Sequence, residues 1–467
     1  MTDIGEYLTT HYLTASLIML LIFVVAYTIA KTSILRKFYL PVALVAGAII
    51  LFIGPQVLGQ WQPGWALPQE FYDTWSILPG ALINVVFACL FLGHPVLGFK
   101  KMWHMAGQQV AYGQMIAWGQ YLIGGLVALL ILIPFFSGTP LMGSLLEIAF
   151  EGSHGTVAGL QLIWEQFNFM DGKDLANGLA TLSLISALVV GMILINWGKR
   201  KGLVAKERRI VKREKGHFYH YTLIRAIQKQ AELMHDHHMT VGKMVRQVIL
   251  VAVSVGIGLG LRALLILLEE NTWGQAGVQI FVYVPAFSIC MFGGIIVNVI
   301  CQKLNIHISS TANSMIATLS LGILIMTAVG TMNLSFMQNP DLMASFWILF
   351  AAGALWLILS FVFIARRIFL KHWFTNAIIS FGQGMGMTAT GLLFAQVVDP
   401  EQKTGAVEAF GYKQLLFEPF MGGGLVTAMS IPLIFIIGLP LWTLICGVLT
   451  LFWLLSGIFY FSKKSFD

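Results

Sequence analysis

The feature that most restricts the fold of this chain is the length of its apolar runs. Many are about 20 residues long, which is the length at which an α-helix crosses the hydrocarbon core of a bilayer. The runs are too continuous for the alternating strands of an outer-membrane barrel. Because 57% of the 467 residues are hydrophobic and only 10% are charged, a water-soluble globular domain is excluded. The sequence predicts an all-α polytopic membrane protein.

From the positions of the apolar runs, we predict five membrane-spanning helices in each half and one more at the end of the sequence. The first half is expected to cross at 13–30, 38–58, 77–98, 109–134 and 176–197. The second half is expected to cross at 244–268, 277–301, 311–332, 344–365 and 414–438, and the additional span is 440–461.

The positive charge is concentrated in the segment between the two halves. The net charge is +7, and nearly half of the 28 Lys and Arg residues lie between Lys199 and Arg246. This concentration indicates topology rather than a nucleic-acid partner, and the positive-inside rule predicts a cytoplasmic linker at 199–243 and an extracytoplasmic N-terminus. The linker run His-Asp-His-His at 235–238 lacks further ligands at suitable spacing, so no structural metal is predicted.

Two segments, 141–166 and 373–398, do not fit as membrane crossings. Glycine-rich runs interrupt them, EGSHGTVAGL at 151–160 and FGQGMGMTATG at 381–391. Counting either as a full span would put cation-rich loops on the wrong side, so we predict two re-entrant hairpins. With five spans per half they enter from opposite faces, which predicts an inverted repeat: 1–198, then 244–438, with 439–467 as an additional C-terminal span.

Such interrupted helices are suited to binding ions inside a membrane. Non-helical backbone is tolerated there only where protein or a water-filled cavity satisfies it. The free carbonyl groups of an incoming half-helix suit Na⁺, and the free N–H groups of an outgoing half-helix suit an anion. The predicted substrate-binding residues are Gly152, Ser153, His154, Gly155, Thr156, Gly384, Gly386, Thr388 and Thr390. The predicted sodium or coupling residues are Glu151, Ser153, Thr156, Thr388 and Gln383.

Alternative interpretations of the same residues remain. Glycines at this spacing also mark close helix packing. Glu151 could ligate Na⁺, carry a coupling proton or pair with a substrate ammonium group, whereas Glu147 is expected nearer the membrane interface. An enzyme using His154 and Glu151 as an acid/base pair is disfavoured, because no nucleophile set, metal set or cofactor fingerprint accompanies them.

At the two hairpins the sequence resembles the bacterial glutamate:sodium symporter family. That family carries Gly-Gly-His-Gly-Thr in the first hairpin, where this chain has Gly152 to Thr156 with Ser153 in place of a glycine. It carries Gly-x-Gly-x-Gly-x-Thr-Pro-Thr in the second, where this chain has Gly382 to Thr390 with Ala389 in place of the proline. Glu151 stands where the family usually has a small neutral residue, and a weaker likeness extends over about 13–438.

The resemblance implies an inner-membrane homodimer in a bacterium, with two inverted five-span repeats. It implies uptake of glutamate by an elevator motion of a core that holds both hairpins, driven by Na⁺ and without any further cofactor. A related amino acid or carboxylate as substrate, or proton-coupled transport of another small organic anion, is the alternative that the departures leave open.

Overall fold

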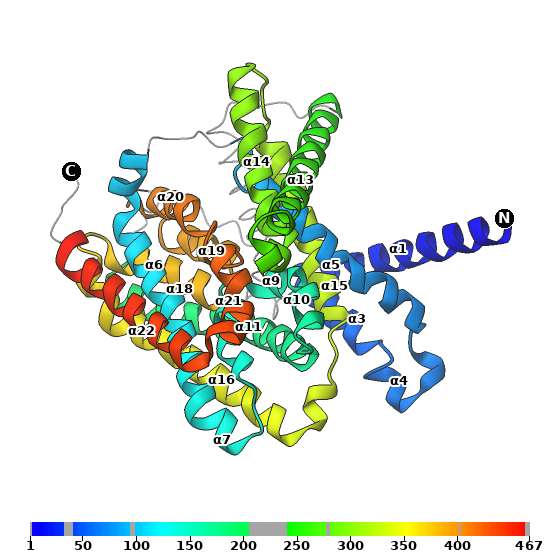
Figure 1. Ribbon diagram of the computed structural model, residues 1–467, viewed down its shortest axis with the longest axis horizontal. Coiled ribbons are helices and arrows are strands. Elements are labelled where there is room, and N and C mark those ends of the chain that lie inside the picture. Colours follow the sequence, from blue (N-terminus) through cyan, green and yellow to red (C-terminus); the bar gives the residue numbers. More distant parts are fainter. Residues whose placement is uncertain are drawn as a thin grey trace.

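The computed structural model describes residues 2–31, 41–93, 99–204, 241–276, 281–400 and 403–462, and throughout these ranges the chain is helical or irregular, without strands. Most of the predicted cytoplasmic linker, including the His-Asp-His-His run, lies outside the described residues. The all-helical class is therefore confirmed for the described chain (Figure 1).

The described chain contains both long and short helices. In the first half they are α1 (Thr2–Ala30), α3 (Val42–Phe52), α4 (Leu58–Trp61), α5 (Gln69–Cys89), α6 (Phe99–Val127), α7 (Ile133–Phe135), α8 (Leu145–Phe150), α9 (Ser153–Gly159), α10 (Gln161–Gln166) and α11 (Met170–Arg200). In the second half they are α13 (Val241–Glu270), α14 (Ala286–Lys303), α15 (Ser310–Gly330), α16 (Pro340–Leu359), α17 (Ala365–Ile368), α18 (Trp373–Met385), α19 (Thr388–Val398), α20 (Ala406–Phe417), α21 (Leu425–Ile437) and α22 (Leu439–Ser456).

Within the described chain, 8 helical segments are long and apolar enough to cross a membrane. Each contains or overlaps one of the predicted spans, so apolar helices of spanning length are confirmed at these places. The segments are Tyr12–Ala30, Trp103–Phe135, Met170–Arg200, Val241–Glu270, Ala286–Lys303, Ser310–Gln338, Pro340–Ile368 and Leu439–Phe461.

The other three predicted spans differ from the structure. The helix expected at 38–58 ends at Phe52, because Gly54 and Pro55 follow. The helix expected at 77–98 is α5, which begins after Pro68 and includes polar residues that hydropathy alone had placed in a loop. The continuous span expected at 414–438 is wrong: residues 418–424 separate α20 from α21, and they contain three consecutive glycines.

The helices pack into two lobes with separate apolar cores. One core joins α1, α3, α5, α14 and α15 and includes Leu184 of α11, and a small adjoining cluster joins α13 to α5 and α14. We call this part the α5/α15 lobe. The other, larger core joins α6, α8, α11, α16, α18 and α19 to α22, and we call it the α6/α18 lobe. In Figure 1 the α5/α15 lobe lies towards the N-terminal end of the view and α22 lies on the opposite side.

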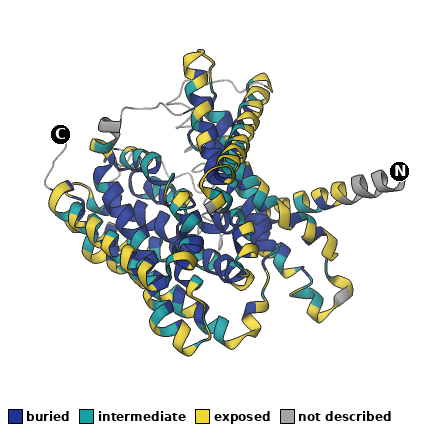
Figure 2. Ribbon diagram, viewed as in Figure 1, coloured by how far each residue is buried: buried dark blue, intermediate teal, exposed yellow. Residues whose placement is uncertain are grey.

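The additional C-terminal helix belongs to the α6/α18 lobe, where α22 packs along α6. Glycines of α6 allow the close approach, since a Cβ on Gly125 would lie 2.2 Å from Thr443 Oγ1 and one on Gly107 would lie 2.4 Å from Phe461 Cε1. The outer sides of α22 and α13 are exposed and apolar, whereas the middle of the α6/α18 lobe is buried (Figure 2). Exposed apolar faces of this kind suit lipid contact.

The short helix α9 lies at the contact between the lobes. It packs against α5 and α15 on one side and against α8 and α11 on the other. A Cβ on Gly155 would lie 2.7 Å from Ile83 Cδ1, and one on Gly159 would lie 2.3 Å from Phe287 Cε1. The first glycine-rich run is therefore held where the two lobes meet.

Candidate functional site

The first glycine-rich run interrupts a helix, as predicted. The helix α8 ends at Phe150, Glu151 and Gly152 are not helical, and α9 begins at Ser153. The hydroxyl of Thr156 donates to the carbonyl oxygen of Gly152 at 2.8 Å, which satisfies one acceptor at the interruption. All of these residues are buried or nearly so, so the interruption lies inside the protein.

Ser153 has a left-handed backbone conformation, with φ of +60°. Only glycine adopts this region without steric cost, and glycine is the residue that the resemblance implies at this place. The serine contributes one polar contact, at 3.4 Å between its Oγ and His154 Nδ1.

We therefore expect Ser153→Gly to stabilise the protein by about 1 kcal/mol, because it removes the left-handed strain. The measurement is the thermal unfolding midpoint of purified protein in detergent, which should rise. Ser137→Gly is the matched control, since Ser137 has φ of +50° but is exposed. A rise for Ser137→Gly together with a fall for Ser153→Gly would show that the contact with His154 outweighs the strain.

His154 is directed towards α11. Its Nε2 lies 2.9 Å from Thr181 Oγ1, and the Thr181 hydroxyl donates to the carbonyl oxygen of Asn177 at 2.9 Å. The threonine oxygen therefore accepts from Nε2–H, and Nδ1 is left as the acceptor that faces Ser153. In this conformation His154 anchors the start of α9 to α11.

The second glycine-rich run also interrupts a helix. The helix α18 ends at Met385, and α19 begins at Thr388 after two residues. The carbonyl oxygen of Gly384 accepts from the Gln120 amide of α6 at 2.7 Å. At Gly386 a Cβ would lie 2.9 Å from Thr390 Oγ1, so the two half-helices are close at this point.

A third interruption, at residues 418–424, was not predicted. Gly422 and Gly423 have φ of +66° and +106°, a backbone conformation that side chains disfavour. The Gly422 N–H donates to Glu147 Oε1 at 2.8 Å. This hydrogen bond joins the third interruption to α8, the helix that precedes the first interruption. A signal was available in the sequence, since Glu418, Pro419 and three consecutive glycines lie within the span expected at 414–438.

Glu147 is fully buried inside the protein. Its Oε1 also accepts from the Thr427 hydroxyl at 2.8 Å, and its Oε2 accepts from the Tyr121 hydroxyl at 2.6 Å. With the Gly422 N–H, three donors from α6, α21 and the third interruption converge on one carboxyl group. Glu147 thus connects the first interruption to the third.

Lys413, on α20, connects all three interruptions. Its ammonium group donates to Gln383 Oε1, two residues before the end of α18, and lies 4.0 Å from Glu151 Oε1 at the first interruption. It also interacts electrostatically with Glu418, at the start of the third. The sequence analysis did not select Lys413, because this residue lies just before the span predicted at 414–438.

Glu418 and Thr388 complete the group. The Thr388 hydroxyl donates to Glu418 Oε1 at 2.8 Å and accepts from Gln414 Nε2 at 2.7 Å. We call the whole set the junction cluster, and its members are Glu151, Gln383, Thr388, Lys413, Gln414 and Glu418.

Several acceptor oxygens around the junction cluster have no hydrogen-bond donor among the described residues. They are Glu151 Oε2, Gln414 Oε1 and Gln120 Oε1. Buried acceptors without donors are costly unless a cation or another donor meets them. Carboxylate and amide oxygens are the ligands that hard cations such as Na⁺ prefer.

Of the residues predicted from sequence, the structure brings Glu151, Gln383 and Thr388 together in the junction cluster. Two of the remaining predicted residues, Gly152 and Gly386, lie in the interruptions themselves. The others lie in the helices that flank the interruptions, and these are Ser153, His154, Gly155, Thr156, Gly384 and Thr390. Ala389 is exposed.

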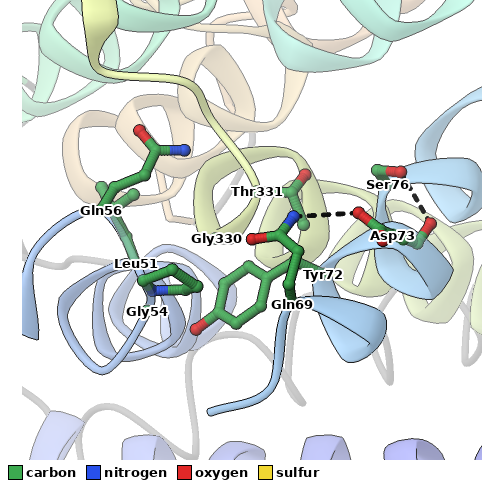
Figure 3. A pocket seen from close by; sticks show the side chains of 10 residues that line it. Leu51, Gly54, Gln56, Gln69, Tyr72, Asp73, Ser76, Gly330 and Thr331 are labelled. Atoms are coloured by element: carbon green, nitrogen blue, oxygen red, sulfur yellow. Dashed lines mark hydrogen bonds between the residues drawn. The ribbon is translucent and has the colours of Figure 1, made fainter. Parts of the chain in front are cut away.

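A separate pocket lies in the α5/α15 lobe, at one end of α3, α5 and α15. Figure 3 shows Gln69 hydrogen-bonded to Asp73 beside Tyr72, with Gln56 and Thr331 across from them. None of the residues that line this pocket belongs to the junction cluster.

The fold and the buried site define a class of protein: a multi-pass, all-helical membrane protein whose charged site is formed by interrupted helices. A family model described as sodium/glutamate symporter matches residues 8–400. The chain belongs to the sodium/glutamate symporter family. Membership implies sodium-coupled glutamate transport, and the family is one of transporters rather than enzymes. A comparison with curated proteins finds no match.

The matched region contains both predicted hairpins but ends before α20. Lys413, Glu418 and the third interruption lie beyond residue 400, as does α22. Half of the residues of the junction cluster thus come from outside the matched region.

Proposed function

We propose that this protein imports glutamate, or a related amino acid or carboxylate, across the bacterial inner membrane by coupling it to Na⁺. The observation that carries the proposal is the meeting of three helix interruptions around buried carboxylates, a lysine and acceptor oxygens without donors. In a chain built from apolar helices, such a site is costly unless it binds polar or charged cargo.

The proposed topology has re-entrant hairpins at 141–166 and 373–398, within inverted repeats at 1–198 and 244–438. The N-terminus is extracytoplasmic and the linker at 199–243 is cytoplasmic. The composition of the lobes supports this arrangement, since α1, α3 and α5 share one lobe with α13, α14 and α15. The other lobe likewise takes corresponding elements from both halves.

The proposed mechanism is of the elevator type, in which the α6/α18 lobe moves against the α5/α15 lobe. Two lobes with separate apolar cores can move as bodies, because each retains its own packing. The α5/α15 lobe would then be the static part and would form the homodimer that the resemblance implies. The contacts of α9 with helices of both lobes support this proposal, because α9 begins directly after the first interruption.

In the proposed site, the residues predicted from sequence act together with those that the structure adds. The substrate carboxylate binds near the start of α19, where Thr388 begins a helix with free N–H groups. Na⁺ binds oxygens of Glu151, and the acceptors without donors on Gln120 and Gln414 are further candidate ligands. Lys413 offsets the charge of Glu151, which would otherwise repel an acidic substrate.

The test is uptake of radiolabelled glutamate by the purified protein in sealed vesicles. An inward Na⁺ gradient is expected to drive accumulation, and replacing Na⁺ with K⁺ should abolish it. Vesicles without protein provide the background. Uptake that proceeds equally without Na⁺ would contradict sodium coupling, and a pH gradient that replaced the Na⁺ gradient would favour the proton-coupled alternative.

A further inference from the structure

The Lys413 ammonium group is unusual because it is buried in the middle of a membrane protein. Its side chain is 1% exposed and that of Glu151 is 2% exposed. Ionisable side chains at such depth pair with one another and mark pathways for ions or substrates. Lys413 also comes from outside the region that the family model matches.

The surrounding residues hold the lysine in one place. Gly113 of α6 leaves the space for it, since a Cβ at that position would lie 2.4 Å from Lys413 Cε. The ring of Phe417 lies across from it, with its centroid 3.6 Å from Nζ. A cation over an aromatic face is attracted to the ring. The pocket is therefore shaped for a cation at this position.

The neighbouring carboxyl groups favour a cation at this point. The Glu147 carboxyl group receives three neutral donors, and Glu418 receives donors from Thr388 and Gln414. Glu151 differs, because among the described residues its Oε2 has no donor and its Oε1 is approached by Lys413. A buried carboxylate without a counter-charge is strongly destabilising, so the Lys413 ammonium group stabilises the Glu151 carboxylate.

The oxygens that Lys413 approaches are also those that an alkali cation would use. A carboxylate oxygen of Glu151 and an amide oxygen of Gln383 come from two different interrupted segments. Together they form a set of hard oxygen ligands, which an ammonium group and Na⁺ can satisfy equally in charge. The difference is that the ammonium group is covalently attached and cannot leave the site.

We propose that Lys413 is a tethered cation, which takes the place of one free coupling cation at the junction of the three interruptions. The inference rests on the proposed transport function and adds to it that part of the positive charge is supplied by the protein. Removing the lysine should then create a binding site for a free monovalent cation beside Glu151.

The experiment compares wild type with Lys413→Gln in two measurements. The first is the dependence of glutamate uptake on external Na⁺, whose Hill coefficient should rise by about one in the variant. The second needs no transport: the Na⁺-induced rise in unfolding temperature of the substrate-free protein in detergent, with choline as reference, should be larger in the variant. If wild type showed no sodium-driven uptake, the proposed function would fail while the second measurement still tested Lys413.

Three further variants separate charge from structure. Lys413→Arg keeps a tethered cation and should behave as wild type in its Na⁺ dependence. The double variant Glu151→Gln with Lys413→Gln removes both charges. Its Hill coefficient for Na⁺ and its Na⁺-induced rise in unfolding temperature should not exceed those of wild type. Lys403→Gln, at an exposed lysine close in sequence, is the matched control and should change neither measurement.

The possible outcomes decide the inference. Should Lys413→Gln be unfolded in choline, Na⁺ should restore it and the double variant should fold without Na⁺. If Lys413→Gln is folded and its response to Na⁺ equals that of wild type, the tethered-cation role is excluded. If Lys413→Gln and the double variant were both unfolded with or without Na⁺, the tethered-cation role would also be excluded. The lysine would then contribute to packing alone.

Discussion

Replacing Gly423 with valine is expected to abolish sodium-driven uptake while leaving the protein in the membrane. Gly423 has φ of +106°, so any side chain there is strained. A Cβ would also lie 2.5 Å from Thr156 Oγ1 and 2.9 Å from Phe87 Cζ. The third interruption would have to move away from the first, and the junction cluster, whose members come from both, would separate.

The matched control for this change is Gly405→Val. Gly405 has φ of +70°, but a Cβ at that position meets nothing within 4 Å. It therefore reproduces the backbone strain without the contact between interruptions. Uptake is measured in vesicles that contain equal amounts of each variant. Normal uptake by Gly423→Val would show that the approach of the third interruption to the first is not needed for transport.

The second large effect is expected for Glu147→Ala, which should strongly destabilise the protein. The change leaves the Tyr121 hydroxyl, the Thr427 hydroxyl and the Gly422 N–H without their acceptor. Each unsatisfied buried donor costs about 1–3 kcal/mol, so the sum is at least about 3 kcal/mol. The expected result is a large fall in the unfolding temperature in detergent and little folded protein in the membrane.

Glu147→Gln should be milder, because the amide carbonyl keeps one acceptor for these donors. Glu165→Ala is the matched control, since Glu165 lies at an exposed position in the same predicted hairpin segment. It should shift the unfolding temperature little. Equal effects of Glu147→Ala and Glu165→Ala would mean that the three hydrogen bonds to Glu147 contribute nothing to stability.

The positions of most membrane helices could be predicted because hydropathy is a local property. A run such as that of α16 must be buried in lipid or protein wherever it lies, so its sequence alone indicates a span. The errors arose where local signals disagreed. Because the residues at the start of α5 are polar, its first turns were assigned to a loop. Because the residues around 418–424 are apolar, a continuous helix was predicted there, although the three glycines indicated an interruption.

The candidate site was predicted in part. The glycine-rich runs correctly indicated where the first two helices break, because glycine and hydroxyl residues at such density disfavour an unbroken apolar helix. Glu151 was recognised as exceptional since a carboxyl group in a membrane segment needs a partner. The partner itself, Lys413, is 262 positions away in the chain and no spacing rule connects the two.

The sequence by itself determined that this protein is a helical, multi-pass membrane protein with two interrupted segments, because burial of apolar runs and freedom of glycine backbone are properties of short stretches. Only the tertiary structure decided which charges meet. Three carboxyl groups and one ammonium group from both halves of the chain are collected in one buried place, and their stability depends on distances that no local pattern encodes.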